Sequence, residues 1–116
     1  MPHIELVLDC DNADAQAEFW VKALGYTLLG GAEQYRLLIP QEGEDGPKLL
    51  LQQVAEPKPG KNRMHFDIHI ADIEAEAERL IALGARRTRD EQYHEFGHDW
   101  VAMADPEGNE FCVCSC

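Results

Sequence analysis

The sequence predicts an α+β fold built from two tandem βαβββ modules. The main observation is an internal repeat: His3–Tyr26 and His65–Ala85 each contain a strand that begins at a histidine, an acidic turn, an amphipathic helix and a Leu-Gly pair. Apolar and polar residues alternate in both leading segments, which is typical of strands with one buried face. Three further strand-like segments follow each helix. Because a repeated module can bring equivalent strands together, we expect the two leading histidines to face one pocket.

The first module begins with a strand over residues 3–9, in which every second residue is apolar. Asp11 or Asn12 is expected to cap the next helix, because short polar side chains accept hydrogen bonds from the first backbone N–H groups. Gly25 is expected to end that helix. The apolar stripe of the helix consists of Ala15, Phe19, Trp20, Ala23 and Leu24. Short strands are predicted at residues 26–30, 34–40 and 48–54.

The second module repeats this order. Its leading strand has an apolar face of Met64, Phe66, Ile68 and Ile70, and a polar face of His65, Asp67 and His69. Asp72 is expected to cap a helix that runs to about Leu83 and stops at Gly84. Strands are predicted at residues 86–89, 98–104 and 110–115, with a turn at residues 105–109.

The 116 residues are expected to form a single domain, because each half alone would be a poor domain. Residues 55–62 are rich in Pro, Gly and Lys, which indicates a connection between the modules. We therefore place module 1 at residues 1–56, the linker at 57–62 and module 2 at 63–116.

The composition excludes several function classes. The chain has 22 acidic and 10 basic residues and a net charge of −12, which disfavours binding to nucleic acids and anionic membranes. No segment approaches the roughly 18 apolar residues of a membrane span, and no signal peptide is evident. A cytoplasmic protein is expected. The four cysteines are expected to be reduced, because the alternate positions 112, 114 and 116 are poorly spaced for disulfides.

Strand geometry limits any metal site. His65 and His69 lie four residues apart on one strand, roughly 13 Å, so they cannot share an ion by strand rise alone. Any metal must take ligands from several strands. Suitable side chains stand at the start of each first strand and on the last strand of each module: His3, Gln52, His65 and Cys112.

Three sequence segments resemble the vicinal-oxygen-chelate superfamily, which includes glyoxalase I, bleomycin-resistance proteins and extradiol dioxygenases. They are FWVKALGY, KNRMHFDIHIAD and DPEGNEFCV. The sequence is most similar to the small bacterial glyoxalase-like branch. The resemblance implies the glyoxalase/bleomycin-resistance fold, a curved mixed sheet around a cavity, and a homodimer.

The resemblance also implies that the family's metal ligands fall on His3, Gln52, His65 and Cys112. Two positions depart from the family pattern. Gln52, or Gln53 if the register slips by one, stands where relatives usually carry Glu. Cys112 replaces the Glu that both binds metal and moves the substrate proton in glyoxalase-type isomerases. These departures argue against classical glyoxalase I activity.

Two functions from different classes follow. One is an enzyme, a lyase, isomerase or dioxygenase-type oxidoreductase, in which a divalent ion polarises adjacent oxygens of a small substrate. Asp67 or a metal-bound water is then expected to take the proton, and Glu5 is a further candidate for the catalytic base. His69 and Trp100 are expected to line the substrate pocket. The alternative is a metal-free protein of the bleomycin-resistance type that sequesters a ligand.

Each assignment also has a simpler explanation. The leading histidines fit ordinary polar residues that face a wet groove, and Cys112 fits a small space-filling residue. Asp67 and Glu5 fit exposed strand carboxylates. His94 and His98 are expected on a loop, either closing over the cavity or simply at the surface.

Overall fold

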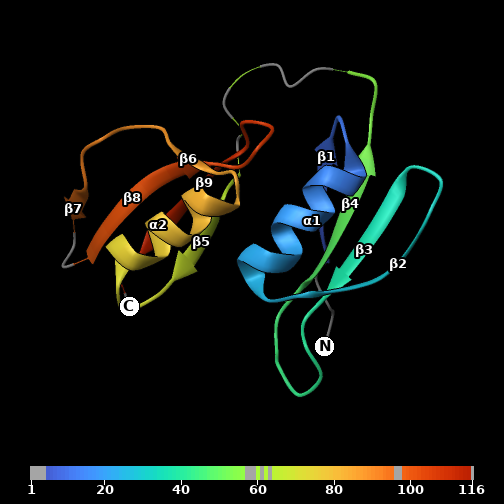
Figure 1. The fold of residues 1–116 in the computed structure, drawn as a ribbon, viewed down its shortest axis with the longest axis horizontal. Helices are drawn as coiled ribbons and strands as arrows, with labels where there is room; N and C mark the ends of the chain where they lie inside the picture. The colour runs from blue at the N-terminus through green and yellow to red at the C-terminus, as the bar shows by residue number, and fades with distance from the viewer. Residues whose placement is uncertain (1–4, 57–59, 61, 63, 96–97, 116) are drawn as a thin grey trace. The chain divides into compact units, whose positions relative to one another are not determined.

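The computed structural model describes residues 5–56, 60, 62, 64–95 and 98–115, and these form a mixed α+β structure (Figure 1). The chain divides into two compact units, Met1–Pro57 and Lys58–Cys116. Each unit is one copy of the repeat, with a helix on one face of its own sheet. Among the described residues, no helix is long and apolar enough to cross a membrane.

The first unit has the predicted βαβββ order. Strands β1 and β4 are parallel and adjacent, and the sheet order is β1-β4-β3-β2. The remaining neighbours are antiparallel. The elements are β1 (Glu5–Cys10), α1 (Ala13–Leu24), β2 (Thr27–Ala32), β3 (Tyr35–Ile39) and β4 (Lys48–Gln53).

Helix α1 starts and ends as its sequence predicts. Of the two expected capping residues, Asn12 is the N-cap, and its side chain accepts a hydrogen bond from the backbone N–H of Ala15 at 3.1 Å. Gly25 follows the helix at φ 70°, a left-handed conformation that glycine adopts without a steric penalty. The helix buries Phe19 and Trp20, which meet edge to face with ring centroids 5.0 Å apart.

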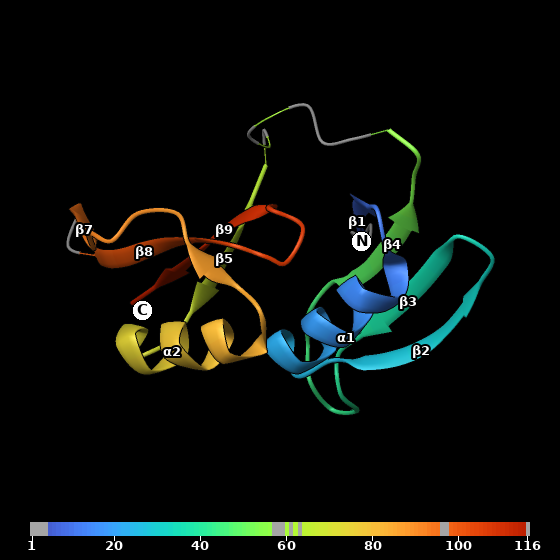
Figure 2. The ribbon, with the colours of Figure 1, turned by 45° about the horizontal axis from the view of Figure 1, so that its top comes forward.

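The second unit repeats this arrangement with one additional strand. Its sheet order is β5-β9-β8-β6, with β5 parallel to β9. Strand β7 also pairs with β8 and lies beside one end of it (Figure 2). The elements are β5 (Phe66–His69), α2 (Ile73–Leu83), β6 (Arg86–Arg87), β7 (Tyr93–Glu95), β8 (His98–Ala104) and β9 (Glu110–Cys114).

The core of the second unit lies between α2 and the sheet. Asp72 is the N-cap, its side chain accepting from the N–H of Ala75, and Gly84 ends the helix at φ 119°. The helix buries Ala77 and Leu80 against alternate residues of the two central strands. These strand residues are Val101, Met103, Phe111 and Val113, all at most 1% exposed.

The expectation that His94 lies on a loop was wrong, because His94 is in β7. His98 is the first residue of β8, which matches the strand predicted over residues 98–104. The two strands pair antiparallel, with Tyr93 opposite Trp100. These two rings stack with centroids 5.1 Å apart and an interplanar angle of 10°. Such aromatic cross-strand pairs stabilise a hairpin, which explains why this short segment forms a strand.

Candidate functional site

The open face of the second sheet, opposite α2, carries the polar residues of β5. Phe66 and Ile68 face the helix, so the alternation of the strand places Asp67 and His69 on the other face. The parallel pairing of β5 with β9 sets Asp67 beside Cys112 and His69 beside Cys114. His65 immediately precedes the strand.

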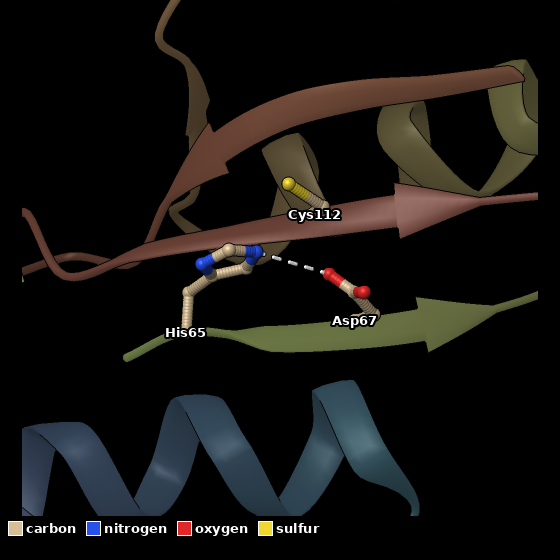
Figure 3. A group of neighbouring side chains, drawn as sticks. All are labelled: His65, Asp67 and Cys112. Carbon is tan, nitrogen blue, oxygen red and sulfur yellow. Dashed lines mark ion pairs between the residues drawn. The ribbon is translucent and has the colours of Figure 1, made fainter. Parts of the chain in front are cut away.

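His65, Asp67 and Cys112 form a cluster on this face (Figure 3). The Nε2 atom of His65 lies 3.2 Å from the Oδ1 atom of Asp67, and both side chains are about half exposed. One ligand atom from each of the three residues lies within 4.8 Å of the other two. In Figure 3 the sulfur of Cys112 lies across from the histidine nitrogen that contacts Asp67, so the three groups point toward one region.

The cluster lies at one end of a pocket of about 730 Å³. This volume is in the range of small-molecule sites, about 300–1,000 Å³. The pocket extends across the open face from β5 and β9 to β8 and the segment that precedes β7. All of its lining residues belong to the second unit. Two of them, His69 and Trp100, were expected from the sequence to line a substrate pocket.

The far end of the pocket is a layered wall of one cation and two aromatic rings. Tyr93 stacks on Trp100, and the guanidinium carbon of Arg89 lies 4.7 Å from the centroid of the Tyr93 ring. Arg89 also forms a 2.7 Å ion pair with Glu91. Arg89 and Tyr93 were not predicted as site residues, because Arg89 ends the predicted strand 86–89, Tyr93 follows it outside any predicted strand, and only the pairing of β7 with β8 brings Tyr93 to Trp100.

A set of partly buried hydrogen bonds holds the segment before β5 against β9. The backbone N–H of Asn62 donates to the Oε2 atom of Glu110 at 3.1 Å, and the Asn62 side chain donates to the Glu110 carbonyl at 3.1 Å. The N–H of Glu110 donates back to the Asn62 side chain at 3.2 Å. These contacts fix the segment that leads to His65 relative to the strand that carries Cys112.

The other predicted ligands and bases belong to the first unit. His3 lies outside the described residues. Glu5 and Gln52 lie on the face of their sheet opposite α1, since β1 and β4 pair in register and their alternate residues pack toward the helix. Gln53 points the other way, and its Oε1 atom accepts from the N–H of Ala13 at the start of α1 at 3.0 Å. Gln53 therefore supports the helix, and Gln52 is the residue on the open face.

The donor set of the cluster fits a divalent transition metal. Imidazole nitrogen, carboxylate oxygen and thiolate sulfur are the three ligand types that zinc uses in proteins. Two ligands about 2.0–2.1 Å from a tetrahedral ion lie roughly 3.3 Å apart, which matches the 3.2 Å between His65 and Asp67. The sequence suggested His65 and Cys112 as ligands, and Asp67 as a base. The structure places Asp67 with the two proposed ligands.

A sequence model of the Glyoxalase-like domain matches residues 5–114. The chain belongs to the Glyoxalase-like domain family. The expected membership of the vicinal-oxygen-chelate superfamily is thereby confirmed, together with the α+β fold. None of the curated proteins gives a match to this glyoxalase-like sequence.

Solved structures share the fold of this glyoxalase-like chain at low sequence identity. A glyoxalase-related enzyme from Fulvimarina pelagi has a TM-score of 0.76 and 16% identity, covering 100% of this chain and 89% of its own. A glyoxalase/bleomycin resistance protein/dioxygenase family enzyme from Burkholderia phytofirmans PsJN has a TM-score of 0.75 and 15% identity, covering 96% of this chain and 95% of its own. A glyoxalase/bleomycin resistance protein/dioxygenase from Nocardioides has a TM-score of 0.75 and 20% identity, covering 99% and 83%. Identities this low establish the fold alone.

Proposed function

We propose that this glyoxalase-like protein is an enzyme that binds a small molecule in the pocket of its second module, beside a divalent ion held by His65, Asp67 and Cys112. The observation that carries the proposal is the convergence of three different metal-binding groups at one end of a ligand-sized cavity. A single acidic or histidine side chain would be weaker support for a metal site, because isolated exposed residues of these types are common.

His65, Asp67 and Cys112 would supply three ligands to a divalent ion, and catalytic zinc sites with three protein ligands keep one position for water or substrate. A divalent ion bound there would supply Lewis-acid polarisation of a substrate oxygen. In this arrangement Asp67 acts as a ligand, so the proton has to be taken by another group. His69 is one candidate, since it lies two residues from Asp67 on the same face of β5 and lines the pocket.

The predicted ligands His3 and Gln52 and the predicted base Glu5 remain predictions. His3 lies outside the described residues, and Gln52 and Glu5 belong to the first unit. The three-residue cluster of the second unit is therefore the part of the predicted site that has a described geometry to support it.

A metal-free binding protein is the second candidate. The observation in its favour is the ion pair between His65 and Asp67, because it gives both groups a partner without a metal. The replacement of a ligand carboxylate by Cys112, relative to the family pattern, favours it as well. In this case the pocket would bind its ligand without catalysing a reaction.

Metal binding distinguishes the two candidates. We expect the protein, purified without an affinity tag and stripped with a chelator, to bind about one Co²⁺ or Zn²⁺ per chain in a calorimetric titration. The Co²⁺ complex should show a thiolate charge-transfer absorption that Cys112→Ser removes. His65→Ala and Asp67→Asn should lower the affinity by more than the roughly 10–100-fold that the loss of an outer-shell partner costs.

The chain provides a matched control for this titration. His94 and Asp99 form another histidine–carboxylate pair in the same sheet, and neither belongs to the three-residue cluster. His94→Ala should therefore leave Co²⁺ binding unchanged. Binding that survives His65→Ala, or an absence of binding in the unaltered protein, would contradict the metal site and favour the binding-protein alternative.

We further propose that the protein is a cytoplasmic homodimer. The family resemblance supports the dimer. So does the edge strand β2, whose six residues are all exposed, among them Leu28 at 47% and Leu29 at 61%. The described cysteines Cys10, Cys112 and Cys114 form no disulfide, which fits a reducing compartment.

A further inference from the structure

We propose that the pocket of the second module recognises an aromatic carboxylate, with the ring against Tyr93 and Trp100 and the carboxylate on Arg89. This inference rests on the proposed function, because it assumes that this pocket is the ligand site. It adds the chemical class of the ligand. Its test can fail even where the test of the metal site succeeds.

The two ends of the pocket lie on opposite sides of β8. The cluster side is formed by β5 and β9, where Cys112 lies directly opposite Ala102 of β8. The wall side is formed by β7, where Tyr93 lies opposite Trp100 of β8. Neighbouring strands are about 4.8 Å apart, so β9 and β7 are separated by roughly 10 Å. A ligand that contacts both ends must be about as long as a substituted benzene ring.

The middle of the pocket is open because its residues are small. Ala102 and Cys112 face each other across β8 and β9, and both line the pocket. Neither side chain is large enough to fill the space between the cluster and the aromatic wall. We place a flat ring in this space, across the edges of the stacked Tyr93 and Trp100 rings, with its carboxylate directed toward Arg89 and its other end toward Cys112.

The wall favours an aromatic ring over a flexible chain. Tyr93 and Trp100 are held nearly parallel by their stacking, so they present rigid apolar surface at a fixed angle. Offset or edge-to-face contacts between aromatic rings contribute beyond the area that they bury. A saturated ring of the same size would gain the free energy of burying apolar surface, but not the additional contribution of contacts between aromatic rings.

Arg89 indicates the charge of the ligand. It is the only lysine or arginine among the described residues that line the pocket, in a chain of net charge −12. Arg89 presents a planar fork of N–H donors that matches a carboxylate. Its present partner Glu91 is 77% exposed. Exposed ion pairs contribute little to stability, so a ligand carboxylate can share or replace that contact at small cost.

The acidic lining residues do not oppose this assignment. Asp67 contacts His65, and Glu110 accepts a hydrogen bond from the backbone of Asn62. Both lie on the cluster side of β8, away from Arg89. The anionic group of the ligand is therefore expected at the Arg89 end and its uncharged end near the cluster.

Three probes of similar size test the proposal by calorimetric titration of the full chain. They are 4-hydroxybenzoate, which has both the ring and the charge, 4-hydroxybenzyl alcohol, which lacks the charge, and trans-4-hydroxycyclohexanecarboxylate, which lacks the aromatic face. We expect 4-hydroxybenzoate to bind about tenfold more tightly than either of the others. Equal binding of the three probes, or no binding of any, would overturn the proposal.

Substitutions test whether Arg89 is responsible for the tighter binding of 4-hydroxybenzoate. Arg89→Gln should weaken the binding of 4-hydroxybenzoate about tenfold and leave the alcohol unchanged. Arg86→Gln is the matched control, because it removes the same charge from the exposed β6 residue, which does not line the pocket. If both variants weaken binding equally, the effect is long-range electrostatics and the Arg89 contact is refuted.

Tryptophan fluorescence tests whether 4-hydroxybenzoate binds beside the aromatic wall of Tyr93 and Trp100. The chain has two tryptophans. Trp20 is 1% exposed in the core of the first unit, whereas Trp100 lines the pocket. We expect 4-hydroxybenzoate to change the emission of the unaltered protein and to leave that of Trp100→Phe unchanged. The same change in Trp100→Phe would place the probe elsewhere.

Metal-stripped and Zn²⁺-loaded protein are titrated side by side. Arg89-dependent binding of 4-hydroxybenzoate in protein that takes up no metal would support this inference and contradict the metal site. Stoichiometric metal binding without preference for 4-hydroxybenzoate would support the metal site and refute this inference.

Discussion

At the scale of single residues, the grouping of His65, Asp67 and Cys112 depends on two periodicities. The two-residue repeat of a strand places His65 and Asp67 on one side of β5. The register between β5 and β9 then brings Cys112 beside Asp67. The first of these relations can be predicted from the sequence, whereas the second depends on which strands pair. For this reason Asp67 was predicted as a base beside the ligands rather than as one of them.

Glu76 and Arg79 illustrate how a local pair on a helix affects pH dependence. The Arg79 guanidinium donates to the Glu76 carboxylate at 2.7 Å, and this hydrogen bond holds the pKa of Glu76 below its ordinary value. A carboxyl whose pKa is lowered in the folded state contributes stability above its unfolded pKa of about 4.3. That contribution is lost as the pH falls through the lower folded pKa.

We expect Glu76→Gln to reduce the free energy of unfolding at pH 7 by about 0.5 kcal/mol, because this is an i,i+3 helix pair in which the Arg79 side chain is 44% exposed and solvent screens the charge. The difference from the unaltered protein should disappear near pH 3. Urea unfolding at several pH values measures it, with Glu78→Gln on the same helix as the control. A difference that grows as the pH is lowered would contradict the assigned direction of the pKa shift.

At the scale of elements, the connection between β8 and β9 is organised by one buried carboxylate. Asp105 is 1% exposed, and its Oδ1 atom accepts hydrogen bonds from the backbone N–H groups of Glu107 and Asn109, both at 2.9 Å. The backbone N–H of Asp105 donates to the carbonyl of Asn109 at 2.9 Å. This loop sets the antiparallel register of the two central strands, one of which carries Cys112.

Removing this acceptor should destabilise the protein. Asp105→Ala leaves two backbone donors without their partner, which costs about 2 kcal/mol. For a chain of 116 residues the loss corresponds to a decrease in Tm of about 8 °C. Asp105→Asn keeps an acceptor oxygen, so its Tm should decrease by less. Calorimetric melting measures both variants, and equal losses would show that the hydrogen bonds to the turn are not the cause.

The helices were predictable because their signals are local. Asn12 and Asp72 accept backbone hydrogen bonds at the two helix starts, and Gly25 and Gly84 follow the two ends. Strand β7 was not predictable in the same way. Its three residues depend on pairing with β8 and on the stacking of Tyr93 with Trp100, which no pattern within the segment reveals.

At the scale of the whole molecule, the repeat produces two units with the same strand order, each with its first and last strands parallel. The two copies differ on their open faces. The second has a cluster, a pocket and an aromatic wall among its described residues. The chemistry proposed for the protein is therefore carried by one copy of a duplicated scaffold.

The homodimer gives a prediction at this scale. Sedimentation at micromolar concentration should give twice the chain mass of 13.1 kDa. Leu29→Lys should shift the equilibrium toward the monomer by about 1–2 kcal/mol, because it places a charge on the exposed apolar edge of β2. Lys48→Ala, on the central strand β4, serves as the control. A monomer at all concentrations would contradict the dimer.

The sequence by itself determined the repeat, the order of the main elements and the family, because alternation, capping residues and turn residues act over a few positions. It also singled out His65 and Cys112. Only the tertiary structure decided which residues meet across strands: Asp67 with Cys112, Tyr93 with Trp100, and Arg89 with Tyr93. The physical reason is that cross-strand register and side-chain stacking depend on strand pairings between segments distant in the chain, which local sequence patterns do not encode.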